Sequence, residues 1–277
     1  LAVSGIREAT YLLRYVPNRK YFQALISFVK HWAKRRGLYS NALCYLGGIS
    51  WAILCAYICK HHPPMDHTRP ILELIKTFFD VLAKRRWQQG IALNNGTTVS
   101  QSKFKDHLPI KLTTYPYDNS TRNVTASSQQ VIIRELKRAS EILSRLNATN
   151  TEEILDELSS DVTTEFTSSF KAFIKFEVSS TDQESYQRWC GWVRSRFVHF
   201  AVNIEKRKFT VQIFPTIIPS SEDPVCAGEL YIGVEGNISD KHEAIIQEEL
   251  KKFISVVTSW VPKNLMKQIK KYGKNTN

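Results

Sequence analysis

Residues 29–51 read VKHWAKRRGLYSNALCYLGGISW, and this stretch predicts a helix, a turn, a glycine pair and a second helix. The first helix ends in a basic run followed by Gly37, which can adopt the positive φ of a helix C-terminal cap. Gly47 and Gly48 then precede an almost entirely apolar helix over 49–59. A helix that begins at a glycine pair leaves backbone N–H groups free at its positive end, and these groups suit a phosphate.

The composition of the whole chain is that of a globular, strongly basic protein. Of its 277 residues, 43% are hydrophobic, which is enough to form a buried hydrophobic core. The length allows one or two domains. The formal net charge of +12 and the pI of about 9.5 suit an anionic partner, although a merely basic soluble surface would give the same balance. Five scattered cysteines without a CxxC pair indicate reduced thiols and no zinc site.

Helical periodicity runs through the first part of the chain. We expect Asn18 to cap the second helix, Thr151 to cap a short later one, and Ile6 and Ala9 to face inward from the first. A polar, aperiodic segment over 88–109 predicts an exposed loop. The predicted helices span 1–16, 18–36, 49–59, 70–86, 127–146 and 151–158.

The composition changes near Asp161, where strands begin to alternate with helices. Alternating apolar and polar residues over 170–179 predict a half-buried strand, and Asp182 marks the start of a long helix. The predicted order is strand, helix, strand, strand, helix, which is a small α+β sandwich. Its elements span 170–179, 182–206, 209–215, 227–234 and 242–272, the last interrupted at Pro262. The strands lack the aromatic signature of RNA-recognition modules, so base stacking on this sheet is not implied.

Four motifs in the same order carry a resemblance to a known family. The segments WAKRRGLYSN and LGGISWA, within residues 32–52, resemble the central domain of eukaryotic poly(A) polymerases. The segments PIKLTTYPYDNSTRNVT (109–125) and WCGWVRSRF (189–197) are similar to two further motifs of that family. Near the start, Gly5-Ile6-Arg7 and Val16-Pro17 match shorter elements. The resemblance therefore extends over almost the whole chain.

The resemblance implies an α+β fold with two domains and an enzymatic role. Residues 1–162 would form an all-helical central domain, and residues 163–277 a C-terminal RNA-binding β-α-β-β-α domain similar to an RNA-recognition module. The family transfers AMP from ATP to the 3′ end of mRNA without a template. The implied partners are ATP, an RNA 3′ end and the factors of mRNA 3′-end cleavage and polyadenylation, and the implied location is the nucleus. We expect no membrane partner, because neither a signal peptide nor a bilayer-long apolar run is visible.

By resemblance, two groups of residues contact the substrates. The Lys30 ammonium would meet the triphosphate, the Tyr39 hydroxyl the phosphates or sugar, and Asn41 the base. The start of the second helix would add backbone N–H groups and an apolar contact. The implied ATP-binding residues are Lys30, Tyr39, Asn41, Gly48 and Ile49. The implied RNA-binding residues are Thr114, Tyr115, Thr125, Phe197 and Val202, with Arg194 and Arg196 available to neutralise phosphates.

These residues also have ordinary structural interpretations. A lysine such as Lys30 is usually solvated on a helix, a tyrosine after a helix often packs as a cap, and a glycine pair often marks close helix packing. The basic run over 34–36 fits a helix C-terminus better than an RNA clamp. The chain also departs from the family pattern at Cys44-Tyr45, where the family has Gly-Phe.

The metal-binding carboxylates of the family have no counterpart in this sequence. The family holds two divalent metals with three aspartates of an N-terminal nucleotidyltransferase domain, two of them in a D-x-D motif after a Gly-Ser pair. No such motif occurs here, so the sequence assigns no catalytic and no metal-binding residue. We expect Mg²⁺ or Mn²⁺ to be bound by an N-terminal domain outside this chain, and the chain alone to be inactive.

Three other interpretations remain open. The absent D-x-D motif is compatible with a non-catalytic RNA-binding or scaffolding module of the same fold. His61, His62 and His67 lie close together in the sequence, but their irregular spacing makes a metal site a weak prediction. N-glycosylation sequons would indicate a secreted glycoprotein if a signal sequence preceded them. They begin at Asn95, Asn119, Asn123, Asn147 and Asn237.

Overall fold

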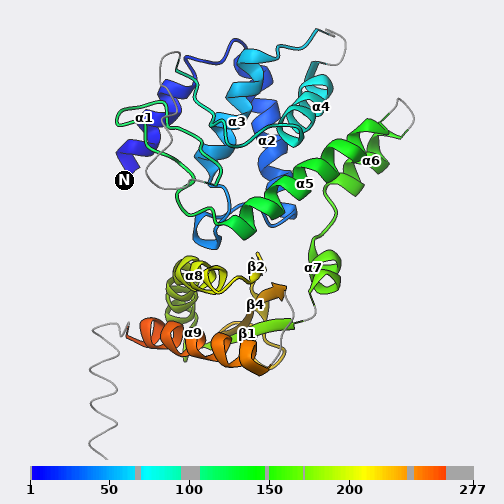
Figure 1. Cartoon of the computed structure of the whole chain (residues 1–277). Helices are drawn as coiled ribbons and strands as arrows, with labels where there is room; N and C mark the ends of the chain where they lie inside the picture. The colour runs from blue at the N-terminus through cyan, green and yellow to red at the C-terminus, as the bar shows by residue number, and fades with distance from the viewer. Residues whose placement is uncertain are drawn as a thin grey trace, which may run out of the picture.

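The computed structural model describes residues 2–65, 70–94, 107–146, 150–170, 172–235 and 240–259. Within these ranges the chain forms a helical part, residues 2–158, and a sheet part, residues 172–259, connected by a short helix (Figure 1). Pro262, His67, the end of the last predicted helix and the sequons at Asn95, Asn147 and Asn237 lie outside the described residues. Among the helices that the structure describes, none has both the length and the apolar character needed to cross a bilayer.

The helical part is organised around aromatic side chains in its core. Trp32 packs edge-on against Trp51 and against Phe79, with ring centroids 5.8 Å and 4.7 Å apart, and all three are fully buried. Edge-to-face aromatic packing of this kind joins three helices through one large buried side chain. The helices are α1 Ala2–Leu12, α2 Arg19–Arg35, α3 Gly48–His61, α4 Pro70–Ala83, α5 Ala126–Ser144 and α6 Thr151–Leu158.

The predicted ends of α2 are confirmed. The Asn18 side chain accepts hydrogen bonds from the backbone N–H groups of Lys20 and Tyr21, at 3.0 and 3.2 Å. These bonds satisfy two donors that have no partner inside the helix. At the other end Gly37 has a φ of 69°, the left-handed conformation in which glycine is favoured. A β-carbon at this position would also lie 2.5 Å from Cγ of Pro215, so the sheet part approaches the turn closely.

Two predictions about helix faces and caps are wrong. Ile6 is 70% exposed and Ala9 is exposed, whereas Glu8 is buried. Glu8 is buried because its carboxylate accepts hydrogen bonds from Thr113 and Thr114, including bonds of 2.8 and 2.7 Å from their hydroxyls. The second error concerns α6, whose N-cap position is Asn150, without a side-chain capping bond, and whose first helical residue is Thr151.

The sheet part confirms the α+β class. Its strands are β1 Ala172–Ser179, β2 Thr210–Ile213, β3 Ile218–Pro219 and β4 Ala227–Glu235. They are all antiparallel, in the order β1-β4-β2, and β3 also pairs with β4. In β1 the odd-numbered residues from Phe173 to Ser179 are exposed and the even-numbered ones are buried or half-buried, as the alternating pattern predicted.

Two helices pack on one side of this sheet. They are α8 Gln183–Lys206 and α9 Asp240–Thr258. Phe176 of β1, Phe197 and Phe200 of α8 and Phe253 of α9 form a shared aromatic cluster, with ring centroids 5.2–5.9 Å apart. Asp182 caps α8 as expected, by accepting a hydrogen bond from the Ser185 N–H. The sequence analysis missed α7, Thr163–Ser169, and the very short β3.

Candidate nucleotide and RNA site

The structure brings Lys30, Tyr39 and Gly48 together. A β-carbon built on Gly48 would lie 2.6 Å from the Tyr39 hydroxyl oxygen and 3.9 Å from Cε of Lys30. The three residues belong to α2, to the turn after it and to the first turn of α3. Each of the three residues is half-buried, so each keeps some surface that a ligand can contact. A cation, a phenolic hydroxyl and a helix start therefore share one partly open surface.

The turn after α2 produces this arrangement. Leu38 N–H donates to the Ala33 carbonyl at 2.7 Å and so closes the helix. Tyr39 then pairs with Leu46 in an isolated parallel β-bridge, around the 3₁₀ turn Asn41–Leu43. Cys44 reverses the chain with a φ of 67°, the conformation that favours the glycine found here in the family pattern. The loop thus returns the chain to the start of α3 beside Tyr39.

The start of α3 carries no side-chain cap. Its N-cap residue is Gly47, with φ −81° and ψ 170°, and within the described ranges no side chain caps the first turn. Backbone donors at such a helix start are attractive to an anion. Asn41 is exposed beside Gly47, with its Nδ2 3.8 Å from a β-carbon built there, and Ile49 is half-buried in the first turn. All five predicted ATP-binding residues therefore lie around one loop.

The charge around this loop is positive. Lys34 Nζ lies 5.3 Å from the centre of the Tyr39 ring, a cation–π distance, and Lys30 lies one helical turn earlier on α2. Among the described residues, no carboxylate forms an ion pair with either lysine. Their positive charge is thus available for an anionic ligand.

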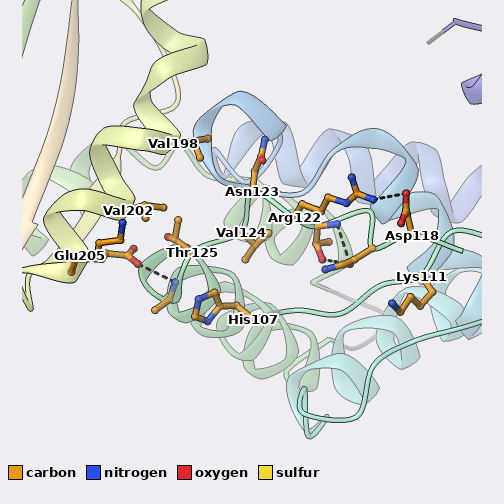
Figure 2. Close-up of a pocket in the computed structure, with 14 residues that line it drawn as sticks. His107, Lys111, Asp118, Arg122, Asn123, Val124, Thr125, Val198, Val202 and Glu205 are labelled. Atoms are coloured by element: carbon orange, nitrogen blue, oxygen red, sulfur yellow. Dashed lines mark hydrogen bonds and ion pairs between the residues drawn. The ribbon is translucent and has the colours of Figure 1, made fainter. Parts of the chain in front are cut away.

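A cavity of about 870 Å³ lies beside this loop, between the 107–126 segment and α8 (Figure 2). Among the described residues that line it, four are basic and two are acidic, and one ion pair joins a basic residue to an acidic one. Asp118 pairs with Arg122, and the Glu205 carboxylate accepts from the backbone N–H groups of Ala126 and Ser127 at 3.2 and 3.0 Å. The basic lining residues are His107, Lys111, Arg122 and Lys206. This balance suits a phosphate backbone.

The predicted RNA-binding residues are divided between different places. Thr125 and Val202 both line the cavity, Thr125 from the chain before α5 and Val202 from α8, as Figure 2 shows. Thr114 is buried and its hydroxyl donates to Glu8, and Tyr115 is 78% exposed; neither lines the cavity. Phe197 is fully buried in the aromatic cluster, so its side chain cannot contact RNA, and this part of the prediction is corrected.

The helical period of α8 explains the placement of Phe197. The buried positions 190, 193, 197, 200, 201 and 204 face the sheet part, whereas Val198, Val202 and Lys206 line the cavity. The position next to Phe197 that does line the cavity is therefore Val198. The two arginines of this helix that the sequence analysis offered for phosphate contacts also have partners within the chain. Arg194 donates to the Pro215 carbonyl at 3.1 Å, and the Arg196 guanidinium lies 3.3 Å from the centre of the Trp192 ring.

Asn123 connects the loop and the cavity, and the sequence analysis missed this role. Its side chain lines the cavity and donates to the Asn41 carbonyl at 3.1 Å. The resemblance over 109–125 includes Asn123, but the sequence analysis gave it no substrate role and named it only as a sequon residue. A neighbouring sequon residue, Asn119, is buried and accepts from the N–H groups of Ile110 and Thr121 at 3.0 and 3.1 Å. Asn119 is therefore a structural residue rather than a glycosylation acceptor.

The described residues offer no metal centre. No group of three or more His, Cys, Asp or Glu side chains within them is placed to hold an ion. This includes His61 and His62, while their predicted companion His67 lies outside the described ranges. All five cysteines are free thiols.

The fold is a helical part followed by a small antiparallel sheet with two helices on it. The basic loop lies on the helical part, and the cavity lies between that part and α8. Residues 21–158 match the family model of the poly(A) polymerase central domain. The chain belongs to the poly(A) polymerase family, and the sequence resemblance is thereby confirmed.

Relatives with that name align with most of the chain. A poly(A) polymerase of Dictyostelium discoideum is 29% identical over 94% of the chain and 34% of its own length. Nuclear poly(A) polymerase 1 of Arabidopsis thaliana is 28% identical over 94% of the chain and 38% of its own length. Nuclear poly(A) polymerase 3 of the same plant is 32% identical over 74% of the chain and 39% of its own length. The chain thus spans between a third and two fifths of these relatives.

Proposed function

We propose that this chain supplies one wall of the ATP site and part of the RNA-binding surface of a template-independent poly(A) polymerase. That enzyme transfers AMP from ATP to the 3′ end of mRNA. The observation that supports the proposal best is the convergence of Lys30, Tyr39 and Gly48 on one partly open surface. Because the chain belongs to the poly(A) polymerase family, ATP is the ligand that these three groups are proposed to bind.

Each residue of the loop has a role that its chemistry allows. The Lys30 ammonium neutralises triphosphate charge, and the Tyr39 hydroxyl donates to a phosphate or sugar oxygen. The α3 helix start adds backbone N–H donors at Gly48 and Ile49, and the missing side chain of Gly48 lets the Tyr39 hydroxyl lie close to them. Asn41, exposed on the same loop, contacts the base, and Ile49 contacts it with its apolar side chain.

The RNA 3′ end is proposed to occupy the cavity between the 107–126 segment and α8. Its size admits nucleotides, and its basic residues neutralise phosphates without reading sequence. Thr125 and Val202 contact the RNA, and Tyr115, which is exposed outside the cavity, extends the track. The five proposed ATP-binding residues, from Lys30 to Ile49, form what we call the nucleotide wall. Asn123 lies between this wall and the cavity. The RNA 3′ end that accepts AMP would have to lie at the same junction.

The divalent metal of the reaction, Mg²⁺ or Mn²⁺, does not fit the described residues, because they contain no suitable group of ligands. On this proposal the metal is held by a nucleotidyltransferase domain outside these residues. On this proposal the chain is inactive by itself. The nuclear names of several relatives support a nuclear location, where 3′-end cleavage and polyadenylation factors would be its partners.

The direct test is Lys30→Ala in a polymerase that joins this chain to its nucleotidyltransferase domain. Loss of one charge-assisted contact should raise the KM for ATP or lower kcat, at a cost of about 1.5–3 kcal/mol. Lys137→Ala is the matched control, because Lys137 is an exposed lysine of α5 in a different groove. Unchanged adenylation kinetics in the Lys30 variant would remove this residue from the site.

A non-catalytic RNA-binding module is the second candidate, and the missing metal ligands among the described residues favour it. The two functions differ in one measurement. If RNA binds this chain but the joined polymerase, with its aspartates in place, incorporates no AMP, the second function is correct.

A further inference from the structure

Arg36 is a charged residue buried at the end of α2. Its side chain has no exposed surface, although it belongs to the basic run over 34–36 that the sequence assigned to a helix C-terminus. Nε and Nη2 donate to the Glu135 carboxylate at 2.8 and 3.3 Å, and Nη1 donates to the Ser160 carbonyl at 2.8 Å. Nη2 also contacts the carboxylate of Glu165. A buried guanidinium is tolerated only when its donors are satisfied in this way.

The partners of Arg36 belong to different parts of the chain. Glu135 lies on α5 in the helical part, whereas Glu165 lies on α7, the short helix that leads to β1. Arg138 of α5 completes the group, with its Nε 3.6 Å from Glu165 and its Nη2 donating to the Ser160 hydroxyl at 3.0 Å. Two arginines and two glutamates therefore form a neutral cluster that attaches the 160–165 connection to the helical part.

This cluster lies next to the proposed nucleotide wall. Gly37, which follows Arg36, is in close contact with Pro215 at the end of β2, and Tyr39 is two residues further along the chain. One turn thus contacts the connection, the sheet part and the nucleotide wall together.

The sheet part has a second attachment at another place. Glu205 of α8 caps the start of α5, and the Ser127 hydroxyl accepts from Val211 N–H of β2 at 3.1 Å. Figure 1 shows α7 and α8 on different sides of the sheet part, both facing the helical part. Arg134 of α5 also donates to the Gln212 side chain of β2 at 3.2 Å, near this second attachment. Attachment at one place would leave the sheet part free to rotate about it, whereas attachments at separated places fix its orientation.

We propose that the Arg36–Glu165 pair is a positioning pair, which sets the orientation of α8 and so aligns the RNA 3′ end with the nucleotide wall. This role rests on the function proposed above. Neither residue touches a substrate. They act through α8, whose Val198 and Val202 form one side of the cavity.

Glu165 is the residue to change, because the Glu165 side chain is 44% exposed and its removal leaves the buried Arg36–Glu135 pair intact. Glu165→Gln should therefore fold. Glu157→Gln is the matched control, since Glu157 forms a comparably exposed ion pair, with Arg145 at 2.6 Å, that does not involve the connection.

The first measurement concerns orientation alone and needs no substrate. Spin labels at positions 84 and 243, exposed residues of the two parts, would be introduced into a Cys226→Ser background. We expect a narrow distance distribution in the parent chain and in Glu157→Gln, and a broader one in Glu165→Gln. Equal distributions in all three proteins would overturn the proposal.

The second measurement separates positioning from stability. In the joined polymerase, Glu165→Gln should raise the KM for an oligoadenylate primer on the order of tenfold and leave the KM for ATP unchanged. Glu165→Asp should recover part of that loss. A broadened distance distribution with an unchanged primer KM would refute the positioning role alone, whereas a parent polymerase without adenylation activity would refute the proposed function.

Discussion

The hydroxyl of Tyr39 occupies the space that a β-carbon on residue 48 would need, 2.6 Å from where that carbon would stand. Gly48 is therefore required by a close approach and not by a left-handed backbone. The atom that blocks the space is the tip of a side chain that can swing away. A larger residue at position 48 should thus move Tyr39 before it disturbs the core.

The first prediction is that Gly48→Ala separates ligand binding from stability. The new methyl group should displace Tyr39 from the start of α3. The KM for ATP in the joined polymerase should then rise roughly tenfold, because one hydrogen bond to a charged phosphate group is lost. The free energy of unfolding should stay within about 0.5 kcal/mol of the parent, because alanine favours the helix and the clash is relieved by a side-chain movement. Steady-state kinetics and urea unfolding measure the two effects.

Gly191→Ala is the control for this substitution. Gly191 lies within α8 with no atom within 4 Å of an added β-carbon, so alanine there should stabilise the chain by about 0.5–1 kcal/mol and leave the KM for ATP unchanged. If Gly48→Ala binds ATP normally, Tyr39 has no part in the nucleotide wall.

The second prediction concerns Glu8, which attaches α1 to the helical part. Its carboxylate accepts from the backbone N–H and the hydroxyl of both Thr113 and Thr114. Glu8→Ala leaves these buried groups without their acceptor and should reduce the free energy of unfolding by about 1–3 kcal/mol. Urea denaturation followed by circular dichroism measures the change.

Glu184→Ala provides the comparison for Glu8. Glu184 forms an exposed ion pair with Arg188 on α8, and removal of such a pair changes stability by no more than about 1 kcal/mol. Equal unfolding midpoints for the Glu8 and Glu184 variants would show that α1 is not held by its carboxylate.

Local patterns in the sequence predicted the parts of the fold that depend on near neighbours. Asn18 and Asp182 were assigned as caps because a cap bonds to residues two or three positions away. The same logic fails for Glu8 and Arg36, whose partners lie about a hundred residues away. Their burial was invisible because charge and periodicity both indicated a solvated position. The short elements α7 and β3 contain too few residues to show a period.

The candidate site also has a part that was predicted from neighbouring residues and a part that was not. Lys30, Tyr39 and Gly48 lie within twenty residues, so a local motif and a family resemblance placed them together. The cavity depends on the approach of the 107–126 segment to α8, and no pattern within either segment signals this approach. Phe197 illustrates the limit. A resemblance identifies the helix, but only the packing of that helix decides which of its faces is buried.

The third prediction is that a single cysteine reacts in the native chain. Burial raises the pKa of Cys44 to about 12 and that of Cys59 to about 11, and it also raises the pKa values of Cys55 and Cys190. These four thiols are buried, so a reagent cannot reach them in the native chain. The pKa of Cys226 is also raised, first by desolvation and then by the charges of Asp223 and Asp182, but this thiol is half-exposed, so its accessibility distinguishes it. Titration with a chromogenic disulfide at pH 8 should therefore modify one thiol quickly and all five in denaturant.

Cys226→Ser tests the assignment of the reactive thiol. The variant should lose the fast reaction and still give four thiols after denaturation. A second thiol that reacts quickly in the parent chain would mean that one of the buried helices opens readily.

The last prediction concerns pH and the start of α8, the helix that carries Val202. The hydrogen bond from the Ser185 N–H holds the pKa of the Asp182 carboxyl below its usual value. A folded-state pKa below the unfolded one stabilises the chain above the unfolded value, near 3.9, and this stabilisation disappears as the pH falls through the folded value. Asp182→Ala should therefore lower the melting temperature at pH 7, and the difference in melting temperature from the parent should shrink as the pH falls below about 4.

Asp182→Asn, an uncharged cap, should retain much of the stability at pH 7 and show a weaker pH dependence. A difference between parent and alanine variant that stays constant from pH 7 to pH 3 would show that the capping bond does not depend on the charge of Asp182.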